Sequence, residues 1–262
     1  MNYLNSKIIG SGSLNVIILH GFLGMSDNWL TIGKKISGFG FKVHLVDLRN
    51  HGKSFWSDQF NYKVMSDDLK LYIDKNKILD FYLIGHSMGG KSAIQFAYNH
   101  PSKVKKLIVL DIINKNYDSN YLHIKILNLL ESIDFSSYKR RIEIENYLFE
   151  NLNDKILVRF LMKNIYRDSY DKFKLKPNVK VLKKNYKNIC YKINLNENFN
   201  IETIFFRGEK SNYIDNDDVK EKFQKFNNYR IIDVPDAGHW IHIDNSNFFL
   251  EKLIPEITKL YL

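Results

Sequence analysis

Four short apolar runs in the first 111 residues constrain the fold of this chain more than any other feature. They are NVIILH (15–20), FKVHLVD (41–47), DFYLIGH (80–86) and KKLIVLD (105–111). Nearly continuous apolar runs of strand length are typical of a parallel sheet covered on both faces. Helix-like segments at 62–76 and 88–99 lie between them. The alternation predicts an α/β fold with a mainly parallel central sheet flanked by helices.

The two ends of the chain complete this pattern. In SKIIGSGSLNVII (6–18), Gly10 and Gly12 separate two strand-like runs, which predicts a leading hairpin. Strand-like runs return late in the chain as ETIFFRG (202–208) and YRIIDVP (229–235). A closing helix is expected over 246–261, with Pro255 expected to kink or interrupt it.

The alternation stops in the middle of the chain. Residues 113–195 are polar and helix-like, with helical stretches near 120–132, 141–150 and 154–165. We therefore predict a helical lid inserted at 113–195 between two parts of one core, 1–112 and 196–262. Most of the lid's large apolar residues are expected to form its own core, although some could line an apolar pocket: Tyr121, Ile124, Phe135, Tyr147 and Phe160.

The stretch LIGHSMGGKSA (83–93) runs an apolar strand into a serine flanked by glycines and then into a helix. Gly85, Ser87 and Gly89 match G-x-S-x-G, a pattern in which a sharp strand-to-helix turn exposes a serine hydroxyl at the top of a sheet. Glycines suit the turn because larger neighbours would clash with a strained backbone. A glycine-rich turn without chemistry is the simpler alternative, but the flanking strand and helix favour Ser87 as a nucleophile.

A nucleophilic serine requires a base. Of the eight histidines, His239 is the best candidate, because DAGHWIH (236–242) directly follows the last predicted strand and can reach the carboxyl edge of the sheet. His242 is the local competitor, and a packed loop histidine is the alternative without chemistry. His86 adjoins Ser87 but is expected to point away and pack in the core.

Two backbone N–H groups are predicted to form an oxyanion hole. One belongs to Met88, the residue after the nucleophile, and the other to Phe22 in the loop HGFLG (20–24) after an early strand. Gly21 and Gly24 allow that backbone to approach a ligand closely. The Phe22 side chain could equally be part of a pocket wall.

The third side chain expected at such a site is an acid that orients the histidine, and it is the hardest residue to place. In this kind of fold it usually follows the strand at 202–207 as G-x-x-D, but here the segment reads Gly-Glu-Lys-Ser and ends in Ser211. Asp111 instead ends LIVLD, 24 residues after Ser87, at the same predicted sheet edge. We predict Asp111 as the acid that orients the imidazole. Asp215 and Asp217 are alternatives, and Asp111 could instead cap a turn.

Composition limits the cellular setting and the partners. The chain has a net charge of +10, and 17 Lys and Arg against 9 Asp and Glu lie between Ile112 and Leu195. A solvated lysine-rich surface is the simplest explanation, whereas lysines such as Lys183 and Lys184 could attract an anionic leaving group like that of coenzyme A. No recognition motif accompanies the charge, so no nucleic-acid partner is expected.

The single cysteine, Cys190, fits a reducing compartment. The N-terminus lacks the layout of a secretory signal, and no apolar run approaches the ~20 residues of a membrane helix. A cytoplasmic protein without stable membrane insertion is expected. The sequence leaves its oligomeric state open.

With these residues in place, the chain resembles the α/β-hydrolase-fold serine hydrolases, and more narrowly the YbfF-type esterases. The shared stretches are HGFLGMSDNWLTIGK (20–34), VHLVDLRNHGKS (43–54), LIGHSMGGKSA (83–93), RGEKSNYI (207–214) and DAGHWIHID (236–244). The absence of an aspartate in RGEKSNYI is typical of this group, whose acid ends the earlier strand, and this supports Asp111. The resemblance implies hydrolysis of short-to-medium acyl esters or acyl-CoA thioesters through an acyl-enzyme, with no metal or organic cofactor.

Other functions are compatible with the same residues. A C–C bond hydrolase or a lyase of menaquinone synthesis could use this triad, and a non-catalytic scaffold of the same fold is a further possibility. A scaffold usually lacks one triad residue, whereas Ser87, His239 and an aspartate are all present here. Ester hydrolysis is therefore the favoured prediction.

Overall fold

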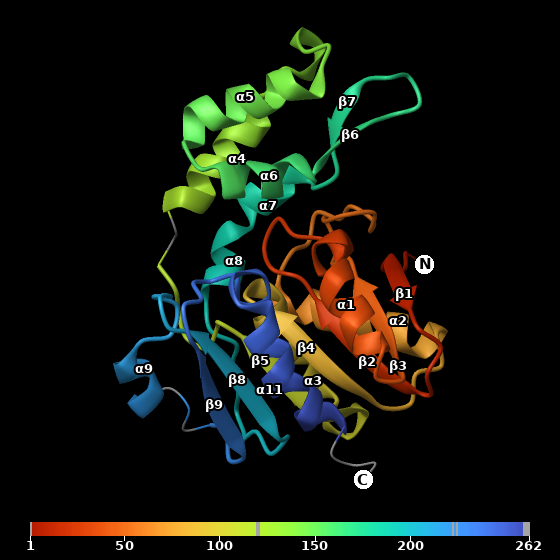
Figure 1. Cartoon of the computed structure of the whole chain (residues 1–262), viewed down its shortest axis with the longest axis vertical. Coiled ribbons are helices and arrows are strands. Elements are labelled where there is room, and N and C mark those ends of the chain that lie inside the picture. Colours follow the sequence, from red (N-terminus) through yellow and green to blue (C-terminus); the bar gives the residue numbers. More distant parts are fainter. Residues whose placement is uncertain (1, 119–120, 222, 224, 259–262) are drawn as a thin grey trace.

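The computed structural model describes residues 2–118, 121–221, 223 and 225–258, and a seven-stranded sheet forms its centre (Figure 1). The strand order is β1-β3-β2-β4-β5-β8-β9, and all neighbouring pairs are parallel except β1 with β3. The predicted mainly parallel sheet is therefore confirmed. Its strands are β1 (Ser6–Ile9), β2 (Leu14–Leu19), β3 (Phe41–Val46), β4 (Phe81–His86), β5 (Val104–Leu110), β8 (Thr203–Gly208) and β9 (Tyr229–Val234).

The predicted leading hairpin is wrong. β1 pairs antiparallel with β3, and β2 lies between β3 and β4, so the first two strands are not neighbours. The connection between them passes close to the start of β3. There Gly10 has φ +79°, and a Cβ on Gly12 would lie 1.7 Å from the carbonyl oxygen of Gly40. The glycines therefore permit this close backbone approach.

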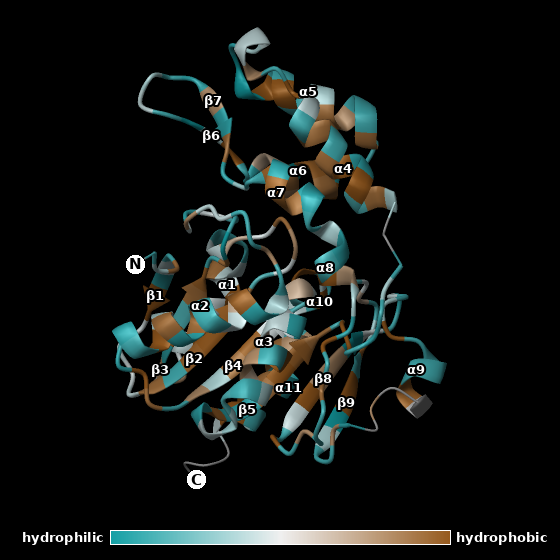
Figure 2. Ribbon diagram, turned by 180° about the vertical axis from the view of Figure 1, so that it is seen from behind, coloured by the Kyte–Doolittle hydropathy of each residue, from teal (hydrophilic) through white to brown (hydrophobic). Residues whose placement is uncertain are grey.

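Helices cover both faces of the sheet (Figure 1). α2 (Tyr62–Lys75) and α3 (Met88–Asn99) pack together on one face, and α1 (Leu30–Ser37) contacts α11 (Ser246–Thr258) on the other. Alternate residues of each strand serve the two faces, because successive side chains of a strand point in opposite directions. Figure 2 shows the apolar strands enclosed between helices with hydrophilic outer surfaces. The helices predicted at 62–76 and 88–99 are confirmed.

Pro255 was predicted to kink or interrupt the last helix, but α11 continues through it, so the interruption does not occur. Pro255 lies on the exposed side, where the carbonyl that it leaves without an N–H partner can meet water. On the opposite side, Phe249, Leu253 and Ile257 are completely buried against the core. Their packing outweighs the lost hydrogen bond. Residues 259–261 of the predicted helix lie outside the described residues.

A separate layer, called the lid below (residues 121–190), lies above the carboxyl ends of the strands (Figure 1). The helical stretches predicted near 120–132, 141–150 and 154–165 are present, although the third is shorter and residue 120 lies outside the described residues. A small hairpin of β6 and β7 was not expected. The lid elements are α4 (Tyr121–Ser132), α5 (Arg141–Leu152), α6 (Lys155–Met162), β6 (Ile165–Arg167), β7 (Phe173–Leu175), α7 (Val179–Lys184) and α8 (Tyr186–Cys190).

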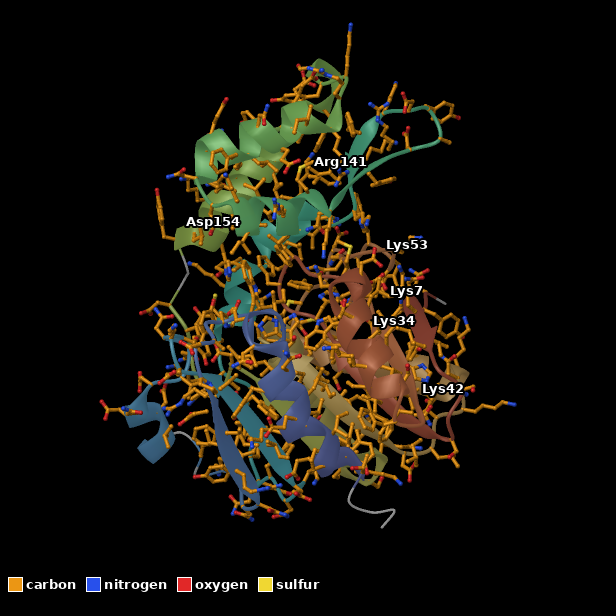
Figure 3. The ribbon with its side chains drawn as sticks, viewed as in Figure 1. Lys7, Lys34, Lys42, Lys53, Arg141 and Asp154 are labelled. Atoms are coloured by element: carbon orange, nitrogen blue, oxygen red, sulfur yellow. The ribbon has the colours of Figure 1, made fainter. Side chains whose placement is uncertain are left out.

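Positive charge is not confined to the lid. Figure 3 shows basic side chains of the core around β1, α1 and β3 as well as Arg141 in the lid, the core residues being Lys7, Lys34, Lys42 and Lys53. Lys183 forms an ion pair with Glu131 at 2.7 Å, so part of the lid charge is neutralised locally. None of the helices in the described ranges combines the length and apolar character needed to cross a bilayer.

Candidate active site

Ser87 occupies a sharp turn between β4 and α3. Its backbone has φ 53° and ψ −122°, on the left-handed side that non-glycine residues rarely adopt. The Ser87 N–H donates to the carbonyl oxygen of Leu110 at 3.0 Å, and the Ser87 carbonyl accepts the N–H of Gly90 at 2.8 Å. These bonds hold the strained turn, which places the hydroxyl at the carboxyl end of β4 and the first N–H groups of α3 beside it.

The glycines around Ser87 are required by close backbone packing. A Cβ on Gly85 would lie 2.4 Å from the carbonyl oxygen of Gly89, and one on Gly89 would lie 2.5 Å from those of Leu19 and His20. Both distances are far below a van der Waals contact. The G-x-S-x-G pattern thus lets α3 start directly against β4 and β2.

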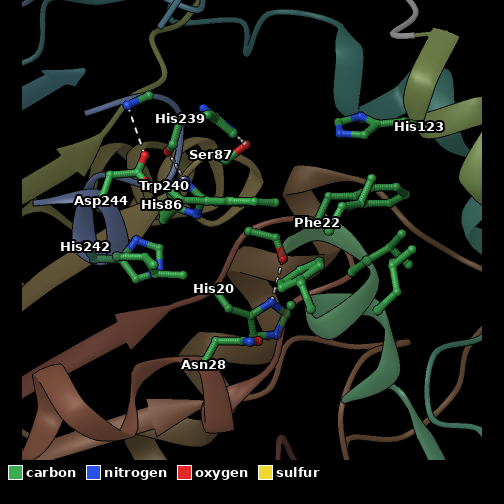
Figure 4. Close-up of a pocket in the computed structure, with 18 of the residues that line it drawn as sticks. His20, Phe22, Asn28, His86, Ser87, His123, His239, Trp240, His242 and Asp244 are labelled. Atoms are coloured by element: carbon green, nitrogen blue, oxygen red, sulfur yellow. Dashed lines mark hydrogen bonds between the residues drawn. The ribbon is translucent and has the colours of Figure 1, made fainter. Parts of the chain in front are cut away.

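His239 reaches Ser87 from the loop after β9 (Figure 4). Its Nε2 lies 2.9 Å from Ser87 Oγ, and its Nδ1 lies 2.7 Å from Asp111 Oδ2. With the proton on Nδ1, Nε2 is free to accept the serine proton. The Tyr213 ring stacks on the imidazole at a centroid distance of 3.7 Å, and His86 Nε2 donates to the His239 carbonyl oxygen at 2.8 Å. The ring is therefore fixed on several sides.

The two neighbouring histidines are packed residues. His86 is buried beneath His239, as expected, and burial lowers its pKa well below the ordinary value. His242, the competitor in the sequence, stacks on Trp29 at a centroid distance of 3.9 Å, and burial lowers its pKa to about 3. It is His239 that contacts Ser87.

Asp111 is completely buried at the end of β5, with a left-handed φ of 50°. Its Oδ1 accepts the Gly208 N–H at 3.0 Å, and its Oδ2 accepts the Ser211 hydroxyl as well as His239. Ser211, at the position where an aspartate is usual, thus donates a hydrogen bond to Asp111. The alternatives lie beside or within α9 (Asn216–Glu221), where Asp215 accepts the N–H of Asp218 and Asp217 is in the first turn.

The loop 20–24 forms a tight turn against the serine. The Gly24 N–H donates to the Gly21 carbonyl oxygen at 2.9 Å, and a Cβ on Gly21 would lie 3.4 Å from Ser87 Cβ. Within the described part of the chain, the N–H groups of Phe22 and Met88 have no protein acceptor. Both N–H groups are therefore available as donors to a ligand bound near Ser87, and an oxyanion hole needs such donors.

Two cavities open on either side of Ser87, and Phe22, His123 and Tyr213 border both. The first has a volume of about 400 Å³ and a mainly apolar wall that includes Leu122, Ile126, Leu157, Phe160, Leu161 and Trp240. The second has a volume of about 390 Å³ and a wall richer in tyrosine and polar groups, including Tyr62, Lys91, Lys115, Asn116, Tyr117 and Tyr186.

The lid supplies much of the first cavity. Of the lid residues considered from the sequence, Phe160 lines it, whereas Ile124, Phe135 and Tyr147 pack against the hydrophobic core. Tyr121 is 82% exposed and belongs to neither group. Lys183 and Lys184 are absent from the walls of both cavities.

Comparison with known proteins agrees with this geometry. Residues 15–246 match the family described as alpha/beta hydrolase fold. The chain belongs to this family. It also resembles the solved structure of a marine microorganism esterase, with 36% identity, a TM-score of 0.94, and coverage of 98% of this chain and 100% of that one.

Two curated relatives indicate which kind of hydrolase this chain is. A Haemophilus influenzae protein named as an esterase/lipase is 30% identical over 91% of this chain and 81% of its own length. The esterase YbfF of Escherichia coli K12 is 26% identical over 91% of both chains. This alpha/beta hydrolase is therefore a carboxylic ester hydrolase of the YbfF type, and the predicted resemblance is confirmed.

Proposed function

We propose that this hydrolase cleaves short-to-medium acyl esters through an acyl-enzyme formed on Ser87. The observation that carries the proposal is the continuous chain of hydrogen bonds from Ser87 through His239 to Asp111, beside an apolar cavity. His239 removes the serine proton as Oγ attacks the ester carbonyl, and buried Asp111 stabilises the imidazolium that forms. The leaving alcohol takes that proton, and water then hydrolyses the acyl-enzyme by the same steps.

The N–H groups of Phe22 and Met88 stabilise the tetrahedral oxyanion in this mechanism. Support comes from the tight packing of the loop 20–24 against Ser87, and from the lack of any acceptor for these two N–H groups among the described residues. Each such donor typically contributes about 10²–10³ in rate, because it is oriented before charge develops.

The first cavity receives the acyl chain and the second receives the leaving group. The mainly apolar lining of the first suits a hydrocarbon chain, and its volume lies in the usual range of ligand pockets. The leaving atom departs towards the more polar second cavity. Because Ser87 attacks the carbonyl carbon, the same arrangement can serve oxygen esters and acyl-CoA thioesters of one acyl chain.

The test uses p-nitrophenyl esters from acetate to dodecanoate and the matching acyl-CoAs. Wild-type protein should hydrolyse the shorter members, and Ser87→Ala should abolish the activity. Leu122→Trp at the rim of the first cavity should lower kcat/KM more for long than for short chains, whereas Asn212→Trp at the second should leave the acyl profile unchanged. Activity retained in Ser87→Ala, or acyl profiles altered equally by both tryptophans, would contradict the proposal.

A further inference from the structure

Besides the ring contacts of His123 and Tyr186 with Phe22, the lid contacts the loop 20–24 through a buried carboxamide. Asn164 lies in the turn between α6 and β6 and is completely buried. Its Nδ2 donates to the carbonyl oxygen of Leu23 at 2.8 Å, across 141 residues of sequence. Among the described residues its Oδ1 has no hydrogen-bond partner. Leaving a buried amide oxygen unpaired destabilises a fold, so the residue is poorly explained by stability alone.

The hydrogen bond to Leu23 continues through two peptide groups. The Leu23 carbonyl shares a peptide with the Gly24 N–H, which donates to the Gly21 carbonyl oxygen at 2.9 Å. The Gly21 carbonyl in turn shares a peptide with the Phe22 N–H. The order is therefore Asn164 amide, Leu23–Gly24 peptide, Gly21–Phe22 peptide, and then the N–H that faces the oxyanion. Hydrogen bonds in such a series orient and polarise one another.

Leu23 depends on outside support for its conformation. Its φ is 56°, in the left-handed region that a leucine rarely adopts. The peptide before its Cα is held by the Leu23 N–H, which donates to His51 Nε2 at 3.2 Å, and the peptide after it is held by Asn164. Burial lowers the pKa of His51 to about 3, so the ring is neutral and Nε2 is available as an acceptor.

The turn that carries Asn164 is itself well fixed. Arg141, labelled in Figure 3, donates to the carbonyl oxygens of Met162 and Ile165 on either side of it. The Asn164 N–H donates to the carbonyl oxygen of Leu161 at 2.9 Å, and the Asn164 carbonyl oxygen accepts the Lys176 N–H at 2.8 Å. The lid therefore presents the amide to the loop in a defined position.

We propose that Asn164 is a positioning residue of the oxyanion hole, through which the lid orients the Phe22 N–H. The inference rests on the proposed function, because it requires Phe22 to bind the oxyanion. In addition to lining the cavity, the lid would thus help to stabilise the transition state indirectly, through the Phe22 N–H. Loss of the Asn164 amide should weaken binding of the tetrahedral intermediate and leave binding of the uncharged ester unchanged.

The test uses Asn164→Leu, which keeps the size of the side chain but removes the hydrogen-bond donor. If this variant does not fold, the shorter Asn164→Ser takes its place. Asn188→Asp is the matched control, because Asn188 Nδ2 also joins lid to core, at the Phe60 carbonyl (3.2 Å), without contact to the loop. We expect kcat to fall about 10- to 100-fold in the Asn164 variants, with KM within about twofold of wild type. Asn188→Asp should retain wild-type kcat.

A second readout separates positioning from general damage to the lid. An alkyl trifluoromethyl ketone forms a tetrahedral adduct with an active serine and so reports on the oxyanion hole. Its inhibition constant should rise in the Asn164 variants by the same factor as kcat falls. Wild-type kcat in a folded Asn164 variant, or an equal loss in Asn188→Asp, would overturn the inference alone. Wild-type protein inactive on the whole ester panel would overturn the proposed function as well.

Discussion

At the scale of single residues, the position of Asp111 is the feature with the clearest chemical consequence. It holds His239 from the end of β5, with Gly208 and Ser211 as additional donors to the same carboxylate. A buried carboxylate with several donors remains a strong acceptor, and it fixes the tautomer that leaves Nε2 free to act as a base.

Replacement of Asp111 by asparagine should therefore lower kcat strongly. The variant keeps the size of the side chain but can stabilise the wrong tautomer of His239, so we expect kcat to fall by about 10³- to 10⁴-fold. Asp215→Asn is the control, since Asp215 caps the start of α9 and should leave kcat unchanged. Steady-state kinetics on a p-nitrophenyl ester measures kcat for both variants. The opposite ranking of the two variants would show that the acid is misassigned.

The sequence was sufficient to predict which residues meet at Ser87 but not how they are supported. Ser87, His239 and Asp111 each end or follow a strand, and parallel strands bring their carboxyl ends to one edge. The contacts of Ser211 with Asp111, Tyr213 with His239 and Asn164 with Leu23 depend on side-chain directions in loops. No periodicity encodes these directions.

At the scale of elements, the junction between β4 and α3 tolerates no added atoms. Gly89→Ala would place a Cβ 2.5 Å from the carbonyl oxygens of Leu19 and His20, and these backbone atoms cannot turn aside as a side chain could. We expect a loss of about 2 kcal/mol or more in the free energy of unfolding, together with loss of activity.

Gly38→Ala is the control for Gly89→Ala, because a Cβ at Gly38 would be less crowded. Gly38 has φ −61°, and the nearest atom to its added Cβ is 3.3 Å away at the end of α1. This alanine should change the free energy of unfolding by less than about 1 kcal/mol. Denaturant titrations of the two variants test the argument, which fails if Gly89→Ala is as stable as Gly38→Ala.

Element identity could be predicted from the sequence better than element pairing. The core strands and α3 follow from apolar runs and a motif, whereas the neighbours of β1 depend on a backbone crossing at Gly10 and Gly12. Helix α11 continues past Pro255 because buried packing on its other face outweighs a local preference. Both errors arise where tertiary contacts override local sequence signals.

At the scale of the whole molecule, buried histidines link stability to pH. Burial lowers the pKa of His51 and His242 to about 3, and it also lowers the pKa of His20 and His86. Below about pH 6.5 the unfolded chain binds protons on these rings, whereas the folded chain does not. Unfolding therefore takes up protons, and the free energy of unfolding should fall as the pH falls from about 6.5 towards 3.

The variant His242→Phe measures how much one of these histidines contributes to the pH dependence of the free energy of unfolding. The ring stacks on Trp29, and Nδ1 of His242 has no hydrogen-bond partner among the described residues, so phenylalanine can take its place. Between about pH 6 and 4, the slope of unfolding free energy against pH should be smaller than in wild type by about 1.4 kcal/mol per pH unit. Denaturant unfolding across this range measures both slopes. Identical slopes would contradict the account.

The central claim is that His239 activates Ser87 as a nucleophile at the junction of the two cavities. The most direct measurement is the rate of labelling by an alkyl fluorophosphonate, followed by peptide mass spectrometry of wild type and His239→Ala. The account predicts one phosphonyl group per chain, located on Ser87, with a labelling rate at least about 10³-fold lower in the variant. Labelling at another residue, or an equal rate in His239→Ala, would contradict it.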